Sequence, residues 1–164
     1  MIYIDLDGVF ANFEKKLLDT FGPTYDQVSP KDLWAELGKE KNLFLHLDEI
    51  DDAQSLFRSI SLIAAEYNRE LAFLTALPIP RGNLTTAKDD KTSWVKQRLS
   101  ETVPVFTVVG GKNKGKFADP GDILIDDMKR NIEVWEKAGG IGIHHETDNS
   151  APTIIKLISI LDKL

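Results

Sequence analysis

The amino-terminal end of the chain carries the feature that most restricts its fold, a short apolar run that ends in two carboxylates. Residues 2–4 are Ile-Tyr-Ile, and Asp5-Leu-Asp7-Gly8 follows at once. Burying such a strand with two carboxylates costs free energy unless a cation or a ligand uses them. Ligands of open α/β sheets bind at the carboxyl ends of the strands. The segment therefore predicts a buried strand that delivers Asp5 and Asp7 to a cleft. The alternative is an ordinary acidic turn, since Asp-Gly is a common turn dipeptide.

A second pair of carboxylates, Asp126 and Asp127, closes another apolar run at residues 122–125. Adjacent carboxylates repel each other unless a cation lies nearby. Mg²⁺ prefers a few carboxylates together with water and phosphate oxygens. The two strand ends therefore predict one Mg²⁺ site, with Asp5, Asp7, Asp126 and Asp127 as the metal residues. For one acid of the second pair, a helix N-cap is the alternative role.

Short apolar runs closed by polar residues or glycine recur along the chain, and helical patterns lie between them. Strands are expected at residues 2–6, 70–74, 103–109, 122–125 and, with a weaker signal, 140–144. Helices are expected at residues 91–99, 130–138 and 153–164. Alternating strands and helices are typical of an α/β fold, here a doubly wound parallel sheet.

The stretch between the first two predicted strands breaks this alternation. It shows helical patterns at residues 10–21, 30–37, 43–47 and 53–67, and no good strand. Because it leaves directly from the acid-bearing strand end, we expect it to form a small helical cap over the site. The predicted division is a catalytic core at residues 1–9 and 69–164 with residues 10–68 as the inserted cap.

Two further segments are candidates for holding a phosphate group. Thr75 closes the second predicted strand, and its hydroxyl together with free backbone N–H groups from Ala76 onward can bind phosphate oxygens, although Thr is also an ordinary strand residue. A loop at residues 110–116 is rich in glycine and lysine but lacks the P-loop pattern. We select Lys116 from this loop, because its spacing places it beside Asp126.

Composition narrows the classes of function. The hydrophobic content of 42% allows a sizeable core, and the absence of cysteine excludes disulfides and thiolate catalysis. The net charge of −6 argues against long nucleic acids and anionic membranes as partners, but a local lysine and a metal still allow a small phosphorylated substrate. No signal-peptide pattern and no membrane-length apolar run is evident, so we expect a cytoplasmic protein.

Several segments in this order resemble the haloacid-dehalogenase superfamily: Asp5-Leu-Asp-Gly-Val9, Leu74-Thr75, Lys116 and Ile125-Asp126-Asp127. Further segments resemble the 5′(3′)-deoxyribonucleotidases of that superfamily: Asp5 to Phe13, Lys41-Asn-Leu-Phe44 and Lys91-Thr-Ser-Trp-Val95. The resemblance implies a Rossmannoid core with a helical cap. It also implies Mg²⁺-dependent hydrolysis of a phosphomonoester through an aspartyl-phosphate.

The resemblance also implies a role for each candidate residue. Asp5 would be the nucleophile. Asp7 would be the general acid and then the general base, with its backbone carbonyl on the metal. Thr75, Ala76 and Lys116 would hold the phosphoryl oxygens. Asp127 would be the direct metal ligand and Asp126 would act through water or a hydrogen bond. Phe13 would stack on a nucleobase, and Trp34 and Phe44 are further candidates for base contacts.

The implied substrate is a nucleoside monophosphate, with pyrimidine deoxyribonucleotides favoured; a homodimer is left open. Two alternatives remain. The first keeps the chemistry but acts on a sugar phosphate or a nucleic-acid 3′-phosphate. The second is a phospho-receiver module, which also combines acids, a Thr, a Lys and Mg²⁺ but orders them differently along the chain. Met128, which stands where the resemblance leads us to expect a basic residue, weakens the substrate prediction more than the reaction prediction.

Overall fold

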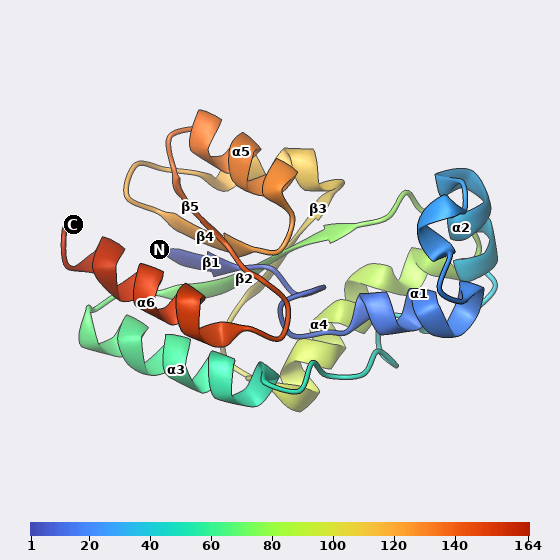
Figure 1. Cartoon of the computed structure of the whole chain (residues 1–164), viewed down its shortest axis with the longest axis horizontal. Helices are drawn as coiled ribbons and strands as arrows, with labels where there is room; N and C mark the ends of the chain where they lie inside the picture. The colour runs from blue at the N-terminus through green and yellow to red at the C-terminus, as the bar shows by residue number, and fades with distance from the viewer.

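A computed structural model describes every residue from Met1 to Leu164 and contains one parallel five-stranded sheet between helices (Figure 1). The strands are β1 (Ile2–Ile4), β2 (Leu71–Leu77), β3 (Val105–Val109), β4 (Ile123–Asp126) and β5 (Ile141–His144). Their order across the sheet is β3-β2-β1-β4-β5. The predicted doubly wound α/β fold is confirmed. In such sheets the strand order reverses beside the first strand, and ligands bind at that point.

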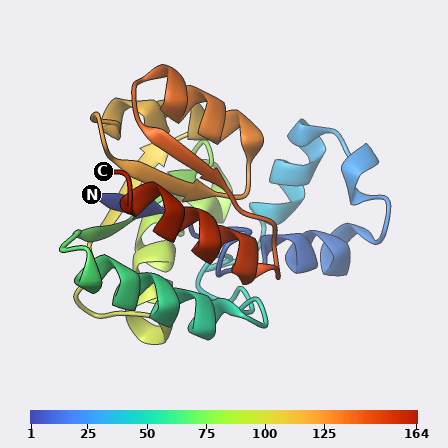
Figure 2. The same ribbon diagram turned by 60° about the vertical axis from the view of Figure 1, so that its left-hand side comes forward.

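Helices cover both faces of the sheet, and others project beyond its carboxyl end. They are α1 (Phe13–Phe21), α2 (Pro30–Leu37), α3 (Ala53–Glu66), α4 (Ala87–Arg98), α5 (Lys129–Lys137) and α6 (Ser150–Leu161), with short 3₁₀ helices η1 (Tyr25–Gln27), η2 (Gly82–Thr86) and η3 (Gly111–Phe117). In Figures 1 and 2, α3 and α6 run side by side on one face while α5 covers the other. None of the helices is both long and apolar enough to cross a membrane.

The alternation of side chains along β1 explains why both faces are covered. Ile2 and Ile4 point into the larger core cluster, together with apolar residues of α3, α4 and α6. Tyr3 points to the opposite face, where its ring meets Trp135 of α5 with ring centroids 5.2 Å apart. Because successive strand residues face opposite sides, an apolar residue at every position of β1 requires a helical layer on each side.

The inserted lobe is smaller than predicted. Helices α1 and α2 project beyond the carboxyl end of the sheet (Figures 1 and 2), but α3 lies beside α6 against the sheet. The side chains of Leu56 and Ile60 on α3 are buried in the main core. The prediction that residues 10–68 form one cap is therefore corrected, because the apolar stripe of α3 needs the sheet as its partner.

Local signals set the boundaries within the cap. Asn12 accepts a hydrogen bond from the Lys15 backbone N–H (2.9 Å) and so caps α1. Ser29 caps α2 in the same way, and Pro30 occupies its first turn. The predicted helix at residues 43–47 is wrong, since turns occupy this stretch after Asn42, whose φ of 52° is left-handed.

Candidate active site

Strand register brings the amino-terminal acid and the downstream pair together. β1 pairs with β4 so that Ile4 lies opposite Ile125, and the Asp5 backbone N–H donates to the Ile125 carbonyl (2.9 Å). Asp5 and Asp126 therefore leave neighbouring strands at the same edge of the sheet. Asp5, Asp126 and Asp127 each offer a carboxylate oxygen, and these oxygens lie within 4.8 Å of one another. A cluster of this kind can bind a metal ion.

A fully buried lysine lies between two of these acids. The Nζ atom of Lys114, on η3, is 2.7 Å from Asp5 Oδ1 and 2.6 Å from Asp126 Oδ2. Burial alone would lower the pKa of Lys114, but the two carboxylates outweigh it and hold the pKa above its usual value. The ammonium is therefore charged and fixed beside Asp5.

The prediction that Lys116 approaches Asp126 is wrong. Lys116 is exposed, and Lys114 takes the position that we assigned to it. Both residues belong to η3, and a 3₁₀ helix turns once in about three residues. Side chains two positions apart therefore point in different directions. Because Lys114 points toward Asp126, Lys116 points away from it. Linear spacing from Asp126 could not reveal this helical phase.

The two acids of the downstream pair have different surroundings. Asp126 is fully buried and accepts hydrogen bonds from the Met128 backbone N–H (2.9 Å) and from the Asn131 side-chain amide (3.0 and 3.1 Å). Asp127 lines the pocket. Burial, followed by the charge of Asp5, raises the pKa of Asp126 to about 6 and that of Asp127 to about 8.

This difference separates the roles that the sequence left open. Asp126 accepts from the backbone N–H of Met128, but Met128 is itself the N-cap of α5 and no side chain caps the helix, so the capping alternative is wrong for both acids. Asp127 lines the pocket, and its three acidic neighbours outweigh the one nearby cation, Lys114. Asn131 was missed by the sequence analysis, although its place one turn into the helix after the acid pair is a usable signal.

The turn after β1 depends on glycine at residue 8. Gly8 has a φ of 76°, and a Cβ atom built there would lie 2.2 Å from Asp127 Oδ2. A side chain at this position would be strained and would collide with the acid. The Asp7-Gly8 turn and the binding site are therefore the same structure rather than alternatives.

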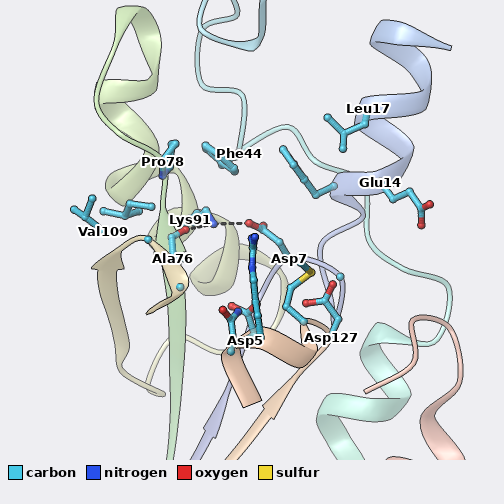
Figure 3. Close-up of a pocket in the computed structure, with 18 of the residues that line it drawn as sticks. Asp5, Asp7, Glu14, Leu17, Phe44, Ala76, Pro78, Lys91, Val109 and Asp127 are labelled. Atoms are coloured by element: carbon cyan, nitrogen blue, oxygen red, sulfur yellow. Dashed lines mark hydrogen bonds and ion pairs between the residues drawn. The ribbon is translucent and has the colours of Figure 1, made fainter. Parts of the chain in front are cut away.

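Asp7 and Thr75 meet around a second buried lysine, which the sequence analysis did not propose as a site residue. Lys91, on α4, is 1% exposed. Its Nζ atom donates to Asp7 Oδ2 (2.5 Å), Thr75 Oγ1 (3.0 Å) and the Ala76 carbonyl (2.8 Å). Figure 3 shows Lys91 and Asp7 pointing toward each other across the pocket floor. Burial raises the pKa of Asp7, and Lys91 opposes this without reversing it.

The cap supplies an aromatic wall to the same pocket. The Phe13 ring, from α1, is nearly parallel to those of Trp34 and Phe44, with centroids 5.9 Å away in each case and interplanar angles of 20° and 17°. All three line a cavity of about 880 Å³ that also contains Asp5 and Asp7. The structure therefore brings the three predicted base contacts together with the acids.

Comparisons with known proteins add little to this geometry. The chain has no significant match among protein-family models or curated protein sequences. Among solved structures, it is similar to the crystal structure of a hydrolase from Streptococcus pneumoniae TIGR4. That alignment covers 96% of this chain and 97% of the other, with 15% sequence identity and a TM-score of 0.49.

Proposed function

We propose that the protein is a Mg²⁺-dependent phosphomonoesterase that hydrolyses nucleoside monophosphates, pyrimidine deoxyribonucleotides in particular, through an aspartyl-phosphate on Asp5. The observation that carries the proposal is the meeting of Asp5, Asp126 and Asp127 in one cluster, in a cavity that Asp7 also lines. The order of these residues along the chain resembles haloacid-dehalogenase phosphatases, and their meeting in one cluster supports that chemistry.

The residues of the cluster fit Mg²⁺. All donors are carboxylate oxygens, which hard divalent cations prefer. The pKa of Asp127 is raised to about 8 because burial and three neighbouring acids leave that carboxyl short of positive charge. Asp5, Asp127 and the Asp7 backbone carbonyl would hold the ion, with Asp126 acting through a hydrogen bond or water. When bound, Mg²⁺ would screen the repulsion between the Asp5 carboxylate and a phosphate dianion.

The chain's own residues account for the transfer itself. A carboxylate oxygen of Asp5 attacks phosphorus, and the bond from phosphorus to the leaving oxygen breaks as the aspartyl-phosphate forms. Asp7 gives its proton to the leaving oxygen; the raised pKa of Asp7 favours the protonated form that this step needs. Asp7 then takes a proton from a water molecule, which attacks phosphorus and releases phosphate and free Asp5. Lys114 stabilises the negative charge beside Asp5.

The aromatic wall supports a nucleotide over a sugar phosphate. Stacking a base on an aromatic side chain contributes about 1–3 kcal/mol and does not depend strongly on base identity. The rings of Phe13, Trp34 and Phe44 already lie nearly parallel, and a planar base could extend this arrangement where a sugar ring could not. The cavity volume of about 880 Å³ lies in the usual range for small-molecule sites.

The test is phosphate release by the purified protein from dUMP, dTMP, ribose 5-phosphate and 4-nitrophenyl phosphate, with MgCl₂ or with EDTA. We expect Mg²⁺-dependent turnover with the highest kcat/KM on the nucleotides, and no turnover by Asp5→Asn. Release that survives EDTA or Asp5→Asn would contradict the reaction. A preference for ribose 5-phosphate would contradict only the substrate class, and a stable phosphorylated Asp5 without turnover would favour the phospho-receiver alternative.

A further inference from the structure

The beginning of α4 buries two consecutive charged side chains behind the pocket, which is an expensive arrangement unless each is paired. Asp90 is 3% exposed and Lys91 is 1% exposed. Asp90 accepts hydrogen bonds from the side chains of Asn42 (3.0 Å) and Thr86 (3.0 Å). The mechanism above gives neither residue a task, although one of them contacts the general acid.

The ammonium of Lys91 is held at a fixed point. Thr75 Oγ1 and the Ala76 carbonyl accept from it on the β2 side, and the Phe44 ring of the cap lies 4.5 Å from the Nζ atom. An ammonium over an aromatic face gains a further attraction when water is excluded. Asp90 also accepts from Asn42 of the same cap loop, so α4 contacts this loop through both residues.

The remaining contact of Lys91 distinguishes the two oxygens of Asp7. The Oδ2 atom accepts from Lys91 at 2.5 Å, whereas the Oδ1 atom is buried and has no hydrogen-bond partner within the protein. Asp7 lines the pocket. The contact with Lys91 therefore fixes the carboxyl of Asp7 at the pocket, where 25% of the side chain is exposed.

We propose that Lys91 is the positioning residue for the general acid: its ammonium holds the Asp7 carboxyl through Oδ2 and so fixes it beside the leaving-group oxygen. This inference rests on the proposed function. Phe44 lies against the same ammonium. Lys91 therefore contacts both the aromatic wall that would receive the leaving nucleoside and Asp7, which would protonate it. Lys91 acts through Asp7 and not on the phosphoryl group.

Two substrates with different leaving groups can test whether Lys91 positions Asp7. The sugar alkoxide released from a nucleotide needs a proton as the bond to phosphorus breaks, whereas 4-nitrophenolate is stable enough to leave without one. Misplacing Asp7 therefore slows the first substrate and spares the second. The value of kcat/KM reports the steps up to departure of the leaving group, so it isolates this effect from later hydrolysis of the aspartyl-phosphate.

The experiment compares Lys91→Met with Lys88→Met, which removes an exposed lysine from the same helix. We expect Lys91→Met to lower kcat/KM on dUMP by about 100-fold and on 4-nitrophenyl phosphate by less than about threefold. The inhibition constant of inorganic phosphate should stay unchanged, as should both activities of Lys88→Met. In an Asp7→Asn background, Lys91→Met should add no further loss on dUMP.

A rescue variant guards against a general folding defect. The chain contains no cysteine, so Lys91→Cys introduces a single thiol that 2-bromoethylamine converts to a lysine-like ammonium. We expect alkylation, verified by mass spectrometry, to restore the ratio of the two kcat/KM values. A verified alkylated protein with an unrestored ratio would contradict the proposal.

The other outcomes are equally decisive. If Lys91→Met slows both substrates equally and weakens inhibition by phosphate, Lys91 binds the phosphoryl group and the inference is wrong. If it slows both equally and lowers the melting temperature, its role is structural and the inference is again wrong. In either case the proposed function stands, provided that the unaltered protein hydrolyses both substrates and Asp5→Asn hydrolyses neither.

Discussion

The pocket has two walls of opposite character. The sheet edge presents buried charges, with Lys114 between Asp5 and Asp126. The cap presents aromatic rings from α1, α2 and a loop. Charges at the sheet edge are placed by strand register and paired within short distances, whereas the rings come from three separate segments. If the proposed function is correct, the reaction should depend on the sheet edge and the choice of substrate on the cap.

The largest effect should follow from removing the buried cation of the sheet edge. Lys114→Met is expected to lower kcat/KM by about 1,000-fold on every substrate, because a preorganised charge beside Asp5 is lost. Lys116→Met, two residues along η3 and exposed, is the matched control and should retain full activity. Steady-state kinetics on dUMP checks both. A larger loss in Lys116→Met would mean that η3 presents the other lysine to the site.

Asp127, which lines the pocket, should control metal affinity. Asp127→Asn is expected to raise the Mg²⁺ concentration for half-maximal activity by about 100-fold or more, since loss of an outer hydrogen-bonding partner alone costs 10- to 100-fold. Calorimetric titration with Mg²⁺ gives an independent measure. Glu133→Gln, an exposed position on α5, should leave the affinity unchanged. An unaltered Mg²⁺ requirement in Asp127→Asn would remove this acid from the metal site.

The cap should affect binding and spare the chemistry. Trp34→Ala is expected to raise KM for dUMP by about tenfold, because one stacking surface is lost. The kcat on dUMP and the inhibition constant of inorganic phosphate should not change. Lys31→Ala, exposed on the same helix, is the control. If Trp34→Ala lowered kcat as strongly as KM rises, the division of labour between the two walls would not hold.

The smallest effect concerns stability. The unfolded chain releases the Asp127 proton at about pH 4, whereas the folded chain holds it until about pH 8. Between these values the folded state binds more protons, so the free energy of unfolding of the metal-free protein falls as pH rises. After allowance for solvent screening we expect about 1 kcal/mol, or about 3 °C in melting temperature.

Calorimetry of the EDTA-treated protein between pH 5 and pH 7.5 measures this decline. Asp127→Asn should flatten it. A stability that rises over the same interval would show that Asp127 is ionised in the folded protein and that its neighbours do not crowd it.

The sheet edge was largely predictable from the sequence. An apolar run followed by Asp5 and another followed by Asp126 specify two strand ends, and parallel sheets bring strand ends together. The lysines were not predictable in the same way. Lys114 depends on the phase of a 3₁₀ helix, and Lys91 lies within a helix whose pattern gives no sign that a cation points inward. The predicted boundary of the cap was wrong because α3 follows the cap residues without a change in amino-acid composition.

The turn at Gly8 has a consequence for how such a chain can vary. Its missing side chain leaves the space that Asp127 occupies, so backbone shape and carboxylate position share one volume. Even a methyl group at this position would have to displace Asp127 or open the loop. A substitution at residue 8 would therefore affect the turn and the acid together.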